Sequence, residues 1–512
     1  MDGVVLTPAE MRRAEEHVFA SGASPEELME EAGWGLARAI QRFFPEPGRL
    51  LLYLGKGHNA GDALAAARHL VPLGWEVTLR WAAPAETCSA LTRRKHEQLL
   101  EIQGGGKGEG RMPRSASGFS VQLDGLLGIG ATGPLSDAYA ALAREMNARR
   151  QAGRAATVSV DIPSGLDGTS GIPGPGAVEA DYTCTVACAK SGLLADRAIS
   201  HTGRIECIAL SRLPGDFEPA DAGLRLITPA ALLSLLPRRP FDFHKGQAGR
   251  VAIAAGSRGL TGAAVLTASG ALAAGAGLVT LLVPEEAYSV VASSAPAEVM
   301  VRPWNGDAFE TLGSFAWDVL AAGPGLGVRI PEGLSAFLEA DPRAAVLDAD
   351  MLNRLAEAGE KIIRRVSDAG PRLLTPHPGE FARLAPDLAA EGKDRRSGVE
   401  GFVERYPATL LLKGARTAIG ERGQPVSFNS TGDPGMATGG MGDVLTGVLA
   451  GLMAQGMPAY DAACAGAWLC GRSAECAMIG GAASRESLRA GNVVEQLGAA
   501  FRSLRQEGAA LD

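Results

Sequence analysis

The sequence has few aromatic residues and no excess of positive charge. Trp, Tyr and Phe make up 5% of its 512 residues, and 57 acidic residues outnumber 49 Lys and Arg, so the formal net charge is −8. Proteins that bind nucleic acids usually present a basic surface to the phosphates and aromatic side chains to the bases. The composition therefore argues against nucleic acid as a partner.

Cysteine is scarce, and its pattern suggests neither disulfides nor a metal site. The seven cysteines are odd in number, form no CxxC motif and lie in Ala-rich apolar surroundings, which is typical of buried thiols in a reducing compartment. The N-terminal stretch has no apolar run of signal-peptide length. We therefore expect a cytoplasmic protein.

One hydrophobic run is long enough to span a bilayer. It extends without charge from Gly259 to Pro284, but it is rich in Ala, Gly, Thr and Ser and is interrupted by Gly275 and Gly277. This composition favours a helix followed by a buried strand over a membrane segment. We expect no membrane partner.

Glycine, in contrast, is abundant. The 67 glycines are about double the average share, and no three-residue period accompanies them, which excludes collagen. In a globular chain, such an excess is expected in turns and in loops where the backbone approaches a ligand.

Apolar strands alternate with helices in both halves of the chain. Two capping boxes, at residues 7–10 and 24–27, begin the first helices. Strands are predicted at residues 50–54, 76–81, 121–127 and 156–161, and then at 250–255, 278–283, 318–322, 344–347, 372–374 and 409–412. This alternation predicts an α/β fold with parallel sheets and right-handed crossovers.

A segment rich in Pro, Gly and charge, residues 211–225, separates the two series of strands. We predict two domains, residues 1–217 and 218–512. In open α/β sheets, ligands bind beyond the carboxyl ends of the strands, so the loops that follow the predicted strands are the candidate site loops.

In the first half, three such loops offer oxygen donors. These donors are Asn59, Asp62, Asp124, Asp161 and Ser164. Amide, carboxylate and hydroxyl oxygens suit a hard cation, and one net carboxylate suits a monovalent ion better than zinc. The loop GKGHNA also resembles a dinucleotide fingerprint, but Asp62 would repel a pyrophosphate at this helix start. The alternative is that these residues only cap helices.

In the second half, the segment GDPGMATGGMGDVLTGVLAGL places a Gly-rich loop before an apolar helix. The backbone N–H groups of residues 440–442 could hold a phosphoryl group while Asp443 takes a proton from an attacking hydroxyl. Lys413 would supply a cation, Glu380 could position magnesium or water, and His377 could donate to a substrate oxygen. The order of these residues predicts a nucleotide-dependent site.

These motifs resemble those of the bifunctional NAD(P)H-hydrate repair enzymes, in which an epimerase domain precedes a nucleotide-dependent dehydratase. In the first half, the resemblance rests on LMEEAG, GKGHNAGDALAAARHL, DGLLGIGATGPL and VSVDIPSGLDG. In the second half, it rests on HKGQAGRVAIAAGS, GPGLG, DADMLN, LLTPHPGEFARL, LLKGART and NSTGDPGMATGGMGDVL. It implies a Rossmann-like three-layer domain followed by a ribokinase-like domain.

The resemblance also implies two activities and their residues. The first domain would interconvert the R and S epimers of hydrated NADH and NADPH, and the second would dehydrate the S epimer with ADP and Mg²⁺. Potassium would be held by Asn59, Asp124 and Ser164. The hydrate would contact His58, Asn59, Ala60, Gly61, Asp62, Gly128, Ile129, Gly130, Ala131, Thr132, Gly133, Pro134 and Asp161 in the first domain, and Ala263, Gly325, His377 and Asp443 in the second. The nucleotide would contact Lys413, Gly414, Ala415, Arg416, Thr417 and Gly442.

Asp443 is the expected base of the dehydratase, and either Asp62 or Asp161 is the expected acid or base of the epimerase. The chain departs from the family at HNAGDA, where NNGGDG is usual, and at Met441, where Thr is usual. Alanine at positions 60 and 63 tolerates most backbone conformations except positive φ. An apolar face on the first helices favours a homo-oligomer.

Two other interpretations remain open. A small-metabolite kinase could use the same Gly-rich helix start and would leave a stably phosphorylated product. Alternatively, the first half could be a binding or dimerisation module without catalysis.

Overall fold

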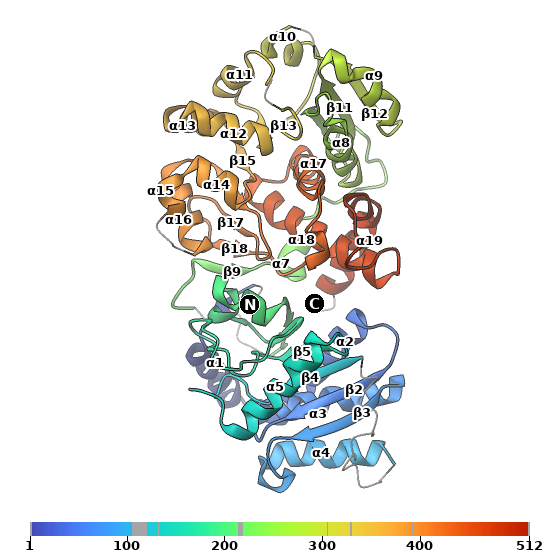
Figure 1. Cartoon of the computed structure of the whole chain (residues 1–512), viewed down its shortest axis with the longest axis vertical. Helices are drawn as coiled ribbons and strands as arrows, with labels where there is room; N and C mark the ends of the chain where they lie inside the picture. The colour runs from blue at the N-terminus through green and yellow to red at the C-terminus, as the bar shows by residue number, and fades with distance from the viewer. Residues whose placement is uncertain are drawn as a thin grey trace. The chain divides into compact units, whose positions relative to one another are not determined.

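The computed structural model describes residues 3–104, 120–131, 133–212, 219–304, 306–327, 330–390 and 394–509. The chain divides into two compact units, the first ending at Ala222 and the second beginning at Gly223. The predicted boundary between residues 217 and 218 lies within the segment 213–218, which is outside the described residues. Each unit has its own sheet (Figure 1).

The first unit is built on a six-stranded parallel sheet with the order β3-β2-β4-β5-β6-β8. Its strands are β2 (Arg49–Leu54), β3 (Glu76–Trp81), β4 (Val121–Gly125), β5 (Ala156–Val160), β6 (Tyr182–Val186) and β8 (Arg204–Ile208). A separate parallel pair joins β1 (Val5–Leu6) to β7 (Ala189–Lys190). The helices are α1 (Pro8–Ala20), α2 (Pro25–Phe43), α3 (His58–Leu70), α4 (Ala90–Ile102), α5 (Asp137–Gln151) and α6 (Ile199–Thr202).

Helices cover both faces of this sheet. On β2, Leu51 and Tyr53 pack with Leu142 and Met146 of α5. Alternate residues of a strand point to opposite faces, and α3, which lies between α2 and α4, contacts β2 and β4 from the other side. The result is the predicted three-layer α/β/α arrangement, with the capping boxes of α1 and α2 formed as expected.

The second unit has a ten-stranded sheet with the order β12-β11-β10-β13-β14-β15-β16-β17-β18-β9. The bounds are β9 (Leu224–Leu226), β10 (Arg250–Ala254), β11 (Leu278–Val283), β12 (Val299–Pro303), β13 (Val319–Ala322), β14 (Ala344–Leu347), β15 (Arg372–Leu374), β16 (Thr409–Leu412), β17 (Ala418–Gly420) and β18 (Val426–Phe428). Only the pairs on either side of β17 are antiparallel in the described sheet. The predicted strands of this half therefore form a parallel sheet in which the loops after β10, β13, β14, β15 and β16 share one edge.

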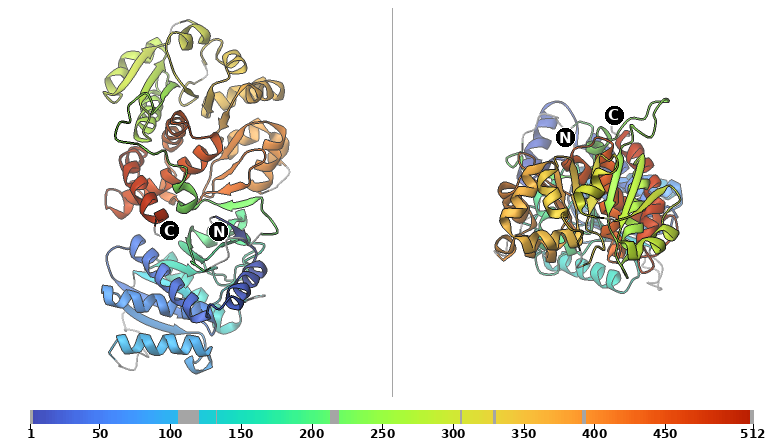
Figure 2. Two further views of the ribbon diagram at one scale, coloured as in Figure 1. Left: turned by 180° about the vertical axis from the view of Figure 1, so that it is seen from behind. Right: turned by 90° about the horizontal axis from the view of Figure 1, so that it is seen from above.

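Helices α8 (Thr261–Ala273), α17 (Met441–Ala454), α18 (Ala459–Ile479) and α19 (Ala490–Ala509) form the main core with one face of this sheet. The last three, red in Figure 2, lie together. The remaining helices are α7 (Pro229–Leu233), α9 (Glu285–Ser294), α10 (Ala308–Gly313), α11 (Leu334–Ala340), α12 (Ala349–Ala358), α13 (Glu360–Ala369), α14 (Pro378–Leu384), α15 (Pro386–Ala390) and α16 (Arg395–Arg405). The charge-free run of the sequence forms α8 and β11, as predicted. Among the described residues, no helix combines the length and the apolar character needed to cross a membrane.

Two glycines set the close approach of α8 and α17. A Cβ at Gly447 would lie 1.9 Å from the carbonyl oxygen of Thr267, and a Cβ at Gly270 would lie 2.4 Å from that of Val444. Because backbone atoms cannot move aside cheaply, both positions require glycine. The contact holds the N-terminal half of α17, which carries Asp443, against the helix that carries Ala263.

We expect Gly447→Ala to destabilise the second unit by about 2 kcal/mol, since overpacking costs about 1–3 kcal/mol and the helix propensity of alanine returns only part of that. The control is Gly498→Ala in α19, where the nearest atom to the new Cβ is 3.8 Å away. This variant should gain up to about 1 kcal/mol. Denaturant unfolding of both variants measures the difference, and equal stability would show that the helices can move apart.

Candidate functional sites

Three segments meet beyond the carboxyl ends of β2, β4 and β5 in the first unit. Asn59, in the first turn of α3, donates from Nδ2 to the carbonyl of Leu127 at 2.9 Å. Ser164 Oγ accepts from the N–H of Leu127 at 3.0 Å and donates to Asp124 Oδ1 at 2.7 Å. The three residues predicted to bind potassium, Asn59, Asp124 and Ser164, therefore converge around Leu127.

Asp124 is fully buried, and burial raises the pKa of its carboxyl group. Its oxygens accept from the N–H of Leu126 at 3.2 Å, from Ser159 Oγ at 3.1 Å, and from the N–H and Oγ of Ser164 at 2.8 and 2.7 Å. All four donors are neutral, so the hydrogen bonds orient the carboxylate without supplying a counter-charge. A cation that takes hard oxygen ligands fits this donor set.

Asp161 follows β5 in a strained conformation, with φ of 67°. Its Oδ1 accepts from the buried ammonium group of Lys190 on β7, from the N–H of Val186 at 3.1 Å and from Thr185 Oγ1 at 3.3 Å. Oδ2 makes none of the hydrogen bonds found within the described residues. Non-glycine residues held in such a conformation are often found at functional sites, and this one presents a carboxylate oxygen beside the predicted potassium loop.

Asp62 lies one helical turn after Asn59 and belongs to the same group of charges. Burial raises the pKa of its carboxyl group well above the usual range, and the negative charges of Asp161 and Glu15 add to the effect. Burial likewise raises the pKa of Glu15, on α1, to about 6. The two carboxyl groups predicted from the sequence therefore differ, because Asp161 pairs with Lys190 whereas Asp62 is held toward its protonated form.

The other residues of the first predicted surface flank this group. His58 is exposed at the start of α3, and Ala60 and Gly61 are buried in its first turn. Gly128 lies against the side-chain oxygen of Asn59, and Ile129, Gly130, Ala131, Gly133 and Pro134 continue as a half-buried to exposed loop. Thr132 lies outside the described residues.

The HNAGDA sequence is not a loop, as the sequence suggested, but the beginning of α3. Ala60 and Ala63 therefore adopt helical backbone, and positive φ is not required at either position. The methyl group of Ala63 packs beside Gly125, where an added Cβ would lie 2.8 Å away. The departure from the family pattern is thus compatible with the fold of the site.

In the second unit, α17 begins at Met441, after Gly440 in the left-handed conformation with φ of 90°. The first N–H groups of this helix have no partner within the helix and form an anion site. Asp443 lies in the first turn. Burial and the neighbouring carboxylates Asp348 and Asp350 together raise the pKa of its carboxyl group to about 6, against the opposing effect of Lys413.

Lys413, at the end of β16, faces this helix start. A Cβ at Gly442 would lie 3.4 Å from Lys413 Nζ. The ammonium group donates to Asp348 Oδ1 at 2.7 Å and lies 3.7 Å from Glu380 Oε2. The cation predicted to meet the nucleotide phosphates is therefore present at the anion site and is held by two carboxylates.

The residues predicted to contact the hydrate come from the first turns of α8 and α17 and from the loops after β13 and β15. Ala263 and Gly325 lie together, because a Cβ at Gly325 would lie 2.8 Å from that of Ala263. His377 caps α14, and its Nδ1 accepts from the N–H groups of Gly379 and Glu380 at 3.0 and 3.4 Å. This assigns the hydrogen to Nε2, which is on an exposed ring and can donate to a ligand.

Glu380 has a structural role that the sequence did not reveal. It is buried, and Oε2 accepts from the N–H of His377 at 2.7 Å, which completes the capping box of α14. Its carboxylate also lies 3.7 Å from Lys413 Nζ and 3.5 Å from His377 Nε2, so it orients protein donors. The expected position of a magnesium ligand is thus occupied by hydrogen bonds within the fold.

The predicted nucleotide segment, residues 413–417, forms a tight turn. Thr417 Oγ1 donates to the carbonyl of Gly414 at 3.1 Å and accepts from its N–H at 3.3 Å. Gly414 and Ala415 are exposed, whereas Arg416 is buried and its guanidinium group is directed toward the carbonyl of Asn429. Arg416 therefore offers a ligand its backbone rather than its charge.

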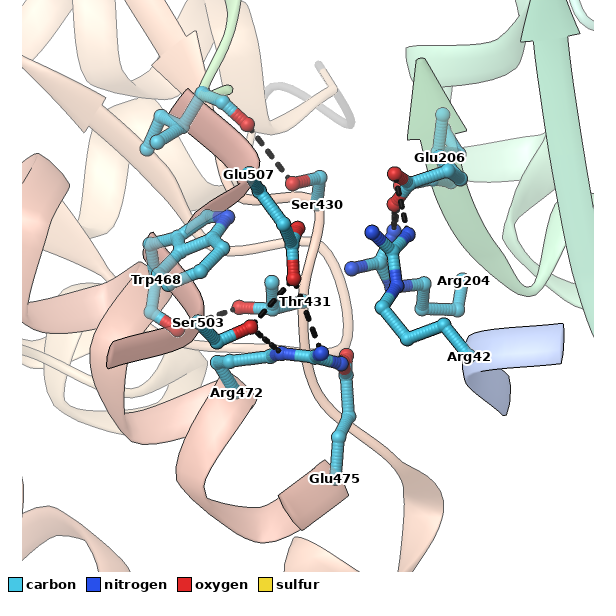
Figure 3. Close-up of polar contacts among 12 residues, drawn as sticks. Arg42, Arg204, Glu206, Ser430, Thr431, Trp468, Arg472, Glu475, Ser503 and Glu507 are labelled. Atoms are coloured by element: carbon cyan, nitrogen blue, oxygen red, sulfur yellow. Dashed lines mark hydrogen bonds and ion pairs between the residues drawn. The ribbon is translucent and has the colours of Figure 1, made fainter. Parts of the chain in front are cut away.

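A buried polar network on α18 and α19 lies next to residues 430–431, at the beginning of the segment that leads to α17 (Figure 3). Arg472 on α18 donates to Glu475 at 2.9 Å, to Ser503 at 2.8 Å and to Glu507 at 3.0 Å. Glu475 Oε1 in turn accepts from the N–H of Gly432 at 2.9 Å. These contacts tie the beginning of the segment that leads to Asp443 to two core helices.

Sequence reasoning missed four charged residues at these sites. They are Glu15, Lys190, Asp348 and Arg395. Of these, only Asp348 could have been identified from the sequence, because its segment DADMLN follows a predicted strand. Lys190 reaches its site through the pairing of β7 with the distant β1, and the guanidinium group of Arg395 on α16 lies over Gly414.

Comparison with known proteins gives two family matches. Residues 251–489 match the NAD(P)H-hydrate dehydratase family, and residues 25–192 match the family described as YjeF-related protein N-terminus. The bifunctional NAD(P)H-hydrate repair enzyme Nnr of Moorella thermoacetica is 37% identical over 511 residues, which cover 94% of this chain and 93% of that protein. The Escherichia coli enzyme of the same name is 33% identical, with 91% and 88% covered.

A solved structure is also similar in part. The ADP/ATP-dependent NAD(P)H-hydrate dehydratase from Bacillus subtilis, co-crystallised with ATP and Mg²⁺, is 25% identical and covers 55% of this chain and 98% of that chain, with a TM-score of 0.46. Both family matches and relatives that span nearly the whole chain agree with the motifs and with the two α/β units. The chain therefore belongs to the family of bifunctional NAD(P)H-hydrate repair enzymes.

Proposed function

We propose that this enzyme repairs hydrated NADH and NADPH in two steps, with the first unit interconverting the R and S epimers and the second dehydrating the S epimer at the expense of ADP. The observation that supports this most directly is the presence of two chemically different centres, one in each unit. One is a group of carboxyl groups with a buried lysine beside a cation site, and the other is a carboxylate at a helix start that binds anions.

In the epimerase unit, the hydrated ring carbon carries a hydroxyl and the ring nitrogen, and opening the carbon–nitrogen bond allows closure on the opposite face. Asp161 Oδ2 would take the hydroxyl proton while the carbon–oxygen double bond forms and the bond to nitrogen breaks. Asp62, held toward its protonated form, would donate its proton to the nitrogen. The reverse transfers close the ring and restore both groups.

Lys190 would act on this reaction through Asp161. Its ammonium group neutralises the carboxylate inside the protein and, with the N–H of Val186, fixes Oδ1, so that Oδ2 remains for the substrate. Potassium would be held by Asn59, Asp124, Ser164 and the carbonyl of Leu127, and when bound it supplies positive charge to the hydrate-binding loop at residues 128–134. The neutral hydrogen bonds on Asp124 support a cation at this position.

In the dehydratase unit, the hydroxyl of the hydrate is a poor leaving group until it is phosphorylated. Asp443 would take the hydroxyl proton as that oxygen bonds to the β-phosphorus of ADP and the bond to AMP breaks. The N–H groups at the start of α17 and Lys413 would stabilise the charge on the transferred group. Phosphate then leaves with the electron pair of its carbon–oxygen bond, the ring nitrogen assists, and loss of a ring proton restores NADH.

Magnesium would enter this site with the nucleotide. Because Asp348 and Glu380 already accept hydrogen bonds from the protein, substrate phosphates and waters would supply most of the ligands of the Mg²⁺ ion, as is common for this metal. When bound, it neutralises the phosphates. Phosphoryl-group contacts are expected from the backbone of residues 413–417 and from Gly442.

The enzyme is proposed to work in the cytoplasm as a homo-oligomer that binds neither nucleic acid nor a membrane. Five of the seven cysteines are buried thiols, as suits a reducing compartment. The net charge of −8 opposes binding to a nucleic-acid backbone.

The dehydratase should lose activity at acidic pH. Because the base form of Asp443 is required and its pKa is raised to about 6, kcat/KM should fall as the pH drops below about 6, by roughly tenfold per unit. This fall is the acidic limb of the pH profile. Asp461→Asn, which alters the equivalent first-turn residue of α18, should leave the acidic limb unchanged. A flat kcat/KM between pH 5 and 7 would contradict the assignment.

The proposed function is tested by mixing the protein with hydrated NADH and following the absorbance of the reduced nicotinamide, with ADP and ATP in parallel reactions. We expect recovery of NADH with release of AMP and phosphate when ADP is supplied. A stably phosphorylated hydrate would support the kinase alternative. No recovery with either nucleotide would refute the repair function.

A further inference from the structure

Asp348 occupies a helix N-cap but does not cap its helix. It precedes α12 with extended φ and ψ of −137° and 166°, and its side chain makes no capping hydrogen bond. The next residue, Ala349, has φ of 49°, which is unfavourable for a residue with a Cβ. An aspartate at this position normally caps its helix by accepting from the second or third N–H group. The carboxylate of Asp348 does not do so and points away from α12.

The carboxylate of Asp348 reaches two other elements. Oδ1 accepts from Lys413 Nζ at 2.7 Å, and Oδ2 accepts from Thr446 Oγ1, on α17, at 2.8 Å. Asp348 is 1% exposed and Thr446 is fully buried. The side chain thus links the cation at the end of β16 to the helix that carries Asp443, one turn before Thr446.

Lys413 is the member of this group that faces the ligand. Its Nζ lies beside Gly442, where the phosphoryl group is expected, and its side chain is 21% exposed. A long, flexible lysine side chain holds such a position only if something fixes it. Asp348 at 2.7 Å does so more closely than Glu380 at 3.7 Å.

We propose that Asp348 is a positioning residue of the dehydratase, which fixes Lys413 against the start of α17 and places a second carboxylate beside Asp443, since Asp348 Oδ2 would lie 3.6 Å from a Cβ at Gly442. The inference rests on the proposed function. Asp348 itself is expected to touch neither the hydrate nor the nucleotide.

The charges around Asp443 make the second part of the proposal specific. Asp348 and Asp350 come from α12, Lys413 comes from the end of β16, and Glu380 of α14 lies behind Lys413. Of these, Asp348 and Asp350 raise the pKa of Asp443, and Lys413 lowers it. Neutralising Asp348 should therefore lower the pKa of Asp443 and weaken it as a base.

The experiment is Asp348→Asn in the full-length enzyme, assayed for dehydration of hydrated NADH across pH and for ADP binding by calorimetry. We expect kcat to fall by about 10- to 100-fold and the acidic limb to move to lower pH by about half a unit to one unit. The Kd for ADP should stay the same or decrease, because Lys413 has lost a neutralising partner. Damage to the fold would instead weaken turnover and binding together and leave the limb in place.

The matched control is Asp307→Asn. Asp307 caps α10 by accepting from the N–H of Glu310 at 2.9 Å, and asparagine caps equally well, so activity and pH profile should be those of the wild type. If Asp348→Asn does not fold, Thr446→Val serves as the test variant in its place, and Thr446→Ser serves as its conservative control. Valine should lower kcat by about threefold or more without moving the limb to lower pH, whereas serine should retain activity.

The outcomes separate this inference from the proposed function. A wild-type enzyme that recovers no NADH refutes the function itself. A wild-type enzyme that works, with an Asp348→Asn variant whose acidic limb is unmoved or whose ADP binding falls in proportion to kcat, overturns the role of Asp348. The same holds if Thr446→Val behaves as the wild type.

Discussion

Asp443→Asn is expected to reduce dehydration of hydrated NADH by about 10³-fold while leaving the affinity for ADP within a few-fold of the wild type. General-base catalysis contributes about 10²- to 10⁴-fold, and an amide cannot accept the hydroxyl proton. The partners expected to bind nucleotide, Lys413 and the first N–H groups of α17, are retained. Turnover is measured by the absorbance of NADH, and ADP affinity is measured by calorimetry.

The control for this variant is Asp461→Asn. Asp461 occupies the same position in the first turn of α18 as Asp443 does in α17, and burial raises the pKa of its carboxyl group too. It therefore reproduces the loss of a half-buried acid near a helix start without affecting the site. Near-normal turnover in Asp443→Asn would show that another group removes the proton, and loss of ADP binding would show that Asp443 mainly organises the nucleotide site.

The sequence was informative where strands are apolar and the following loop carries polar residues. β11 and β14 have the predicted bounds, and the end of β4 and the loop after β5 bring Asp124 and Ser164 together as expected from a parallel sheet. The predicted strand at residues 121–127 is too long, because the chain leaves the sheet after Gly125 to form the loop that contacts Asn59 and Ser164. Long-range hydrogen bonds, rather than local pattern, set that end.

The sequence was less informative about where charged side chains point. Arg416 lies in a motif that predicts nucleotide contact, yet its guanidinium group is buried toward Asn429. Asp348 has the sequence position of a helix cap, yet its carboxylate binds Lys413 and Thr446. The partners of Asp348 lie 65 and 98 residues away in the chain, and that of Arg416 lies 13 residues away on another strand-end segment, so spacing and periodicity do not reveal these contacts.

Two of the three non-glycine residues with positive φ in the described chain mark the proposed sites. Asp161 carries the carboxylate of the first, and Ala349 follows the carboxylate that holds Lys413 in the second. In both cases, a strand ends, the backbone turns sharply, and an acidic side chain meets a lysine from another element. In both places, the unfavourable backbone conformation occurs where a lysine–carboxylate pair lies beside a segment expected to bind substrate, which is the pattern expected when function rather than stability sets the conformation.

The epimerase has a second strong prediction, that Asp161→Asn lowers the rate of epimer interconversion by about 10²-fold or more. Asparagine tolerates the positive φ of Asp161 better than most residues, so the variant should keep its backbone while losing the proton acceptor. Without nucleotide the dehydratase step cannot proceed, so interconversion of a purified epimer can be followed alone by chromatography, with the enzyme-free rate subtracted.

Asp167→Asn is the control, because Asp167 lies in the same loop but is exposed and accepts from the N–H groups of Thr169 and Ser170 at 3.1 and 2.6 Å, as asparagine can.

Asp62→Asn tests the proposed acid. It should slow interconversion comparably, and the wild-type rate should fall as the pH rises through the raised pKa of Asp62. If Asp161→Asn interconverts the epimers at the wild-type rate, the first unit does not use this carboxylate as its base, and a binding or dimerisation role for that unit regains support.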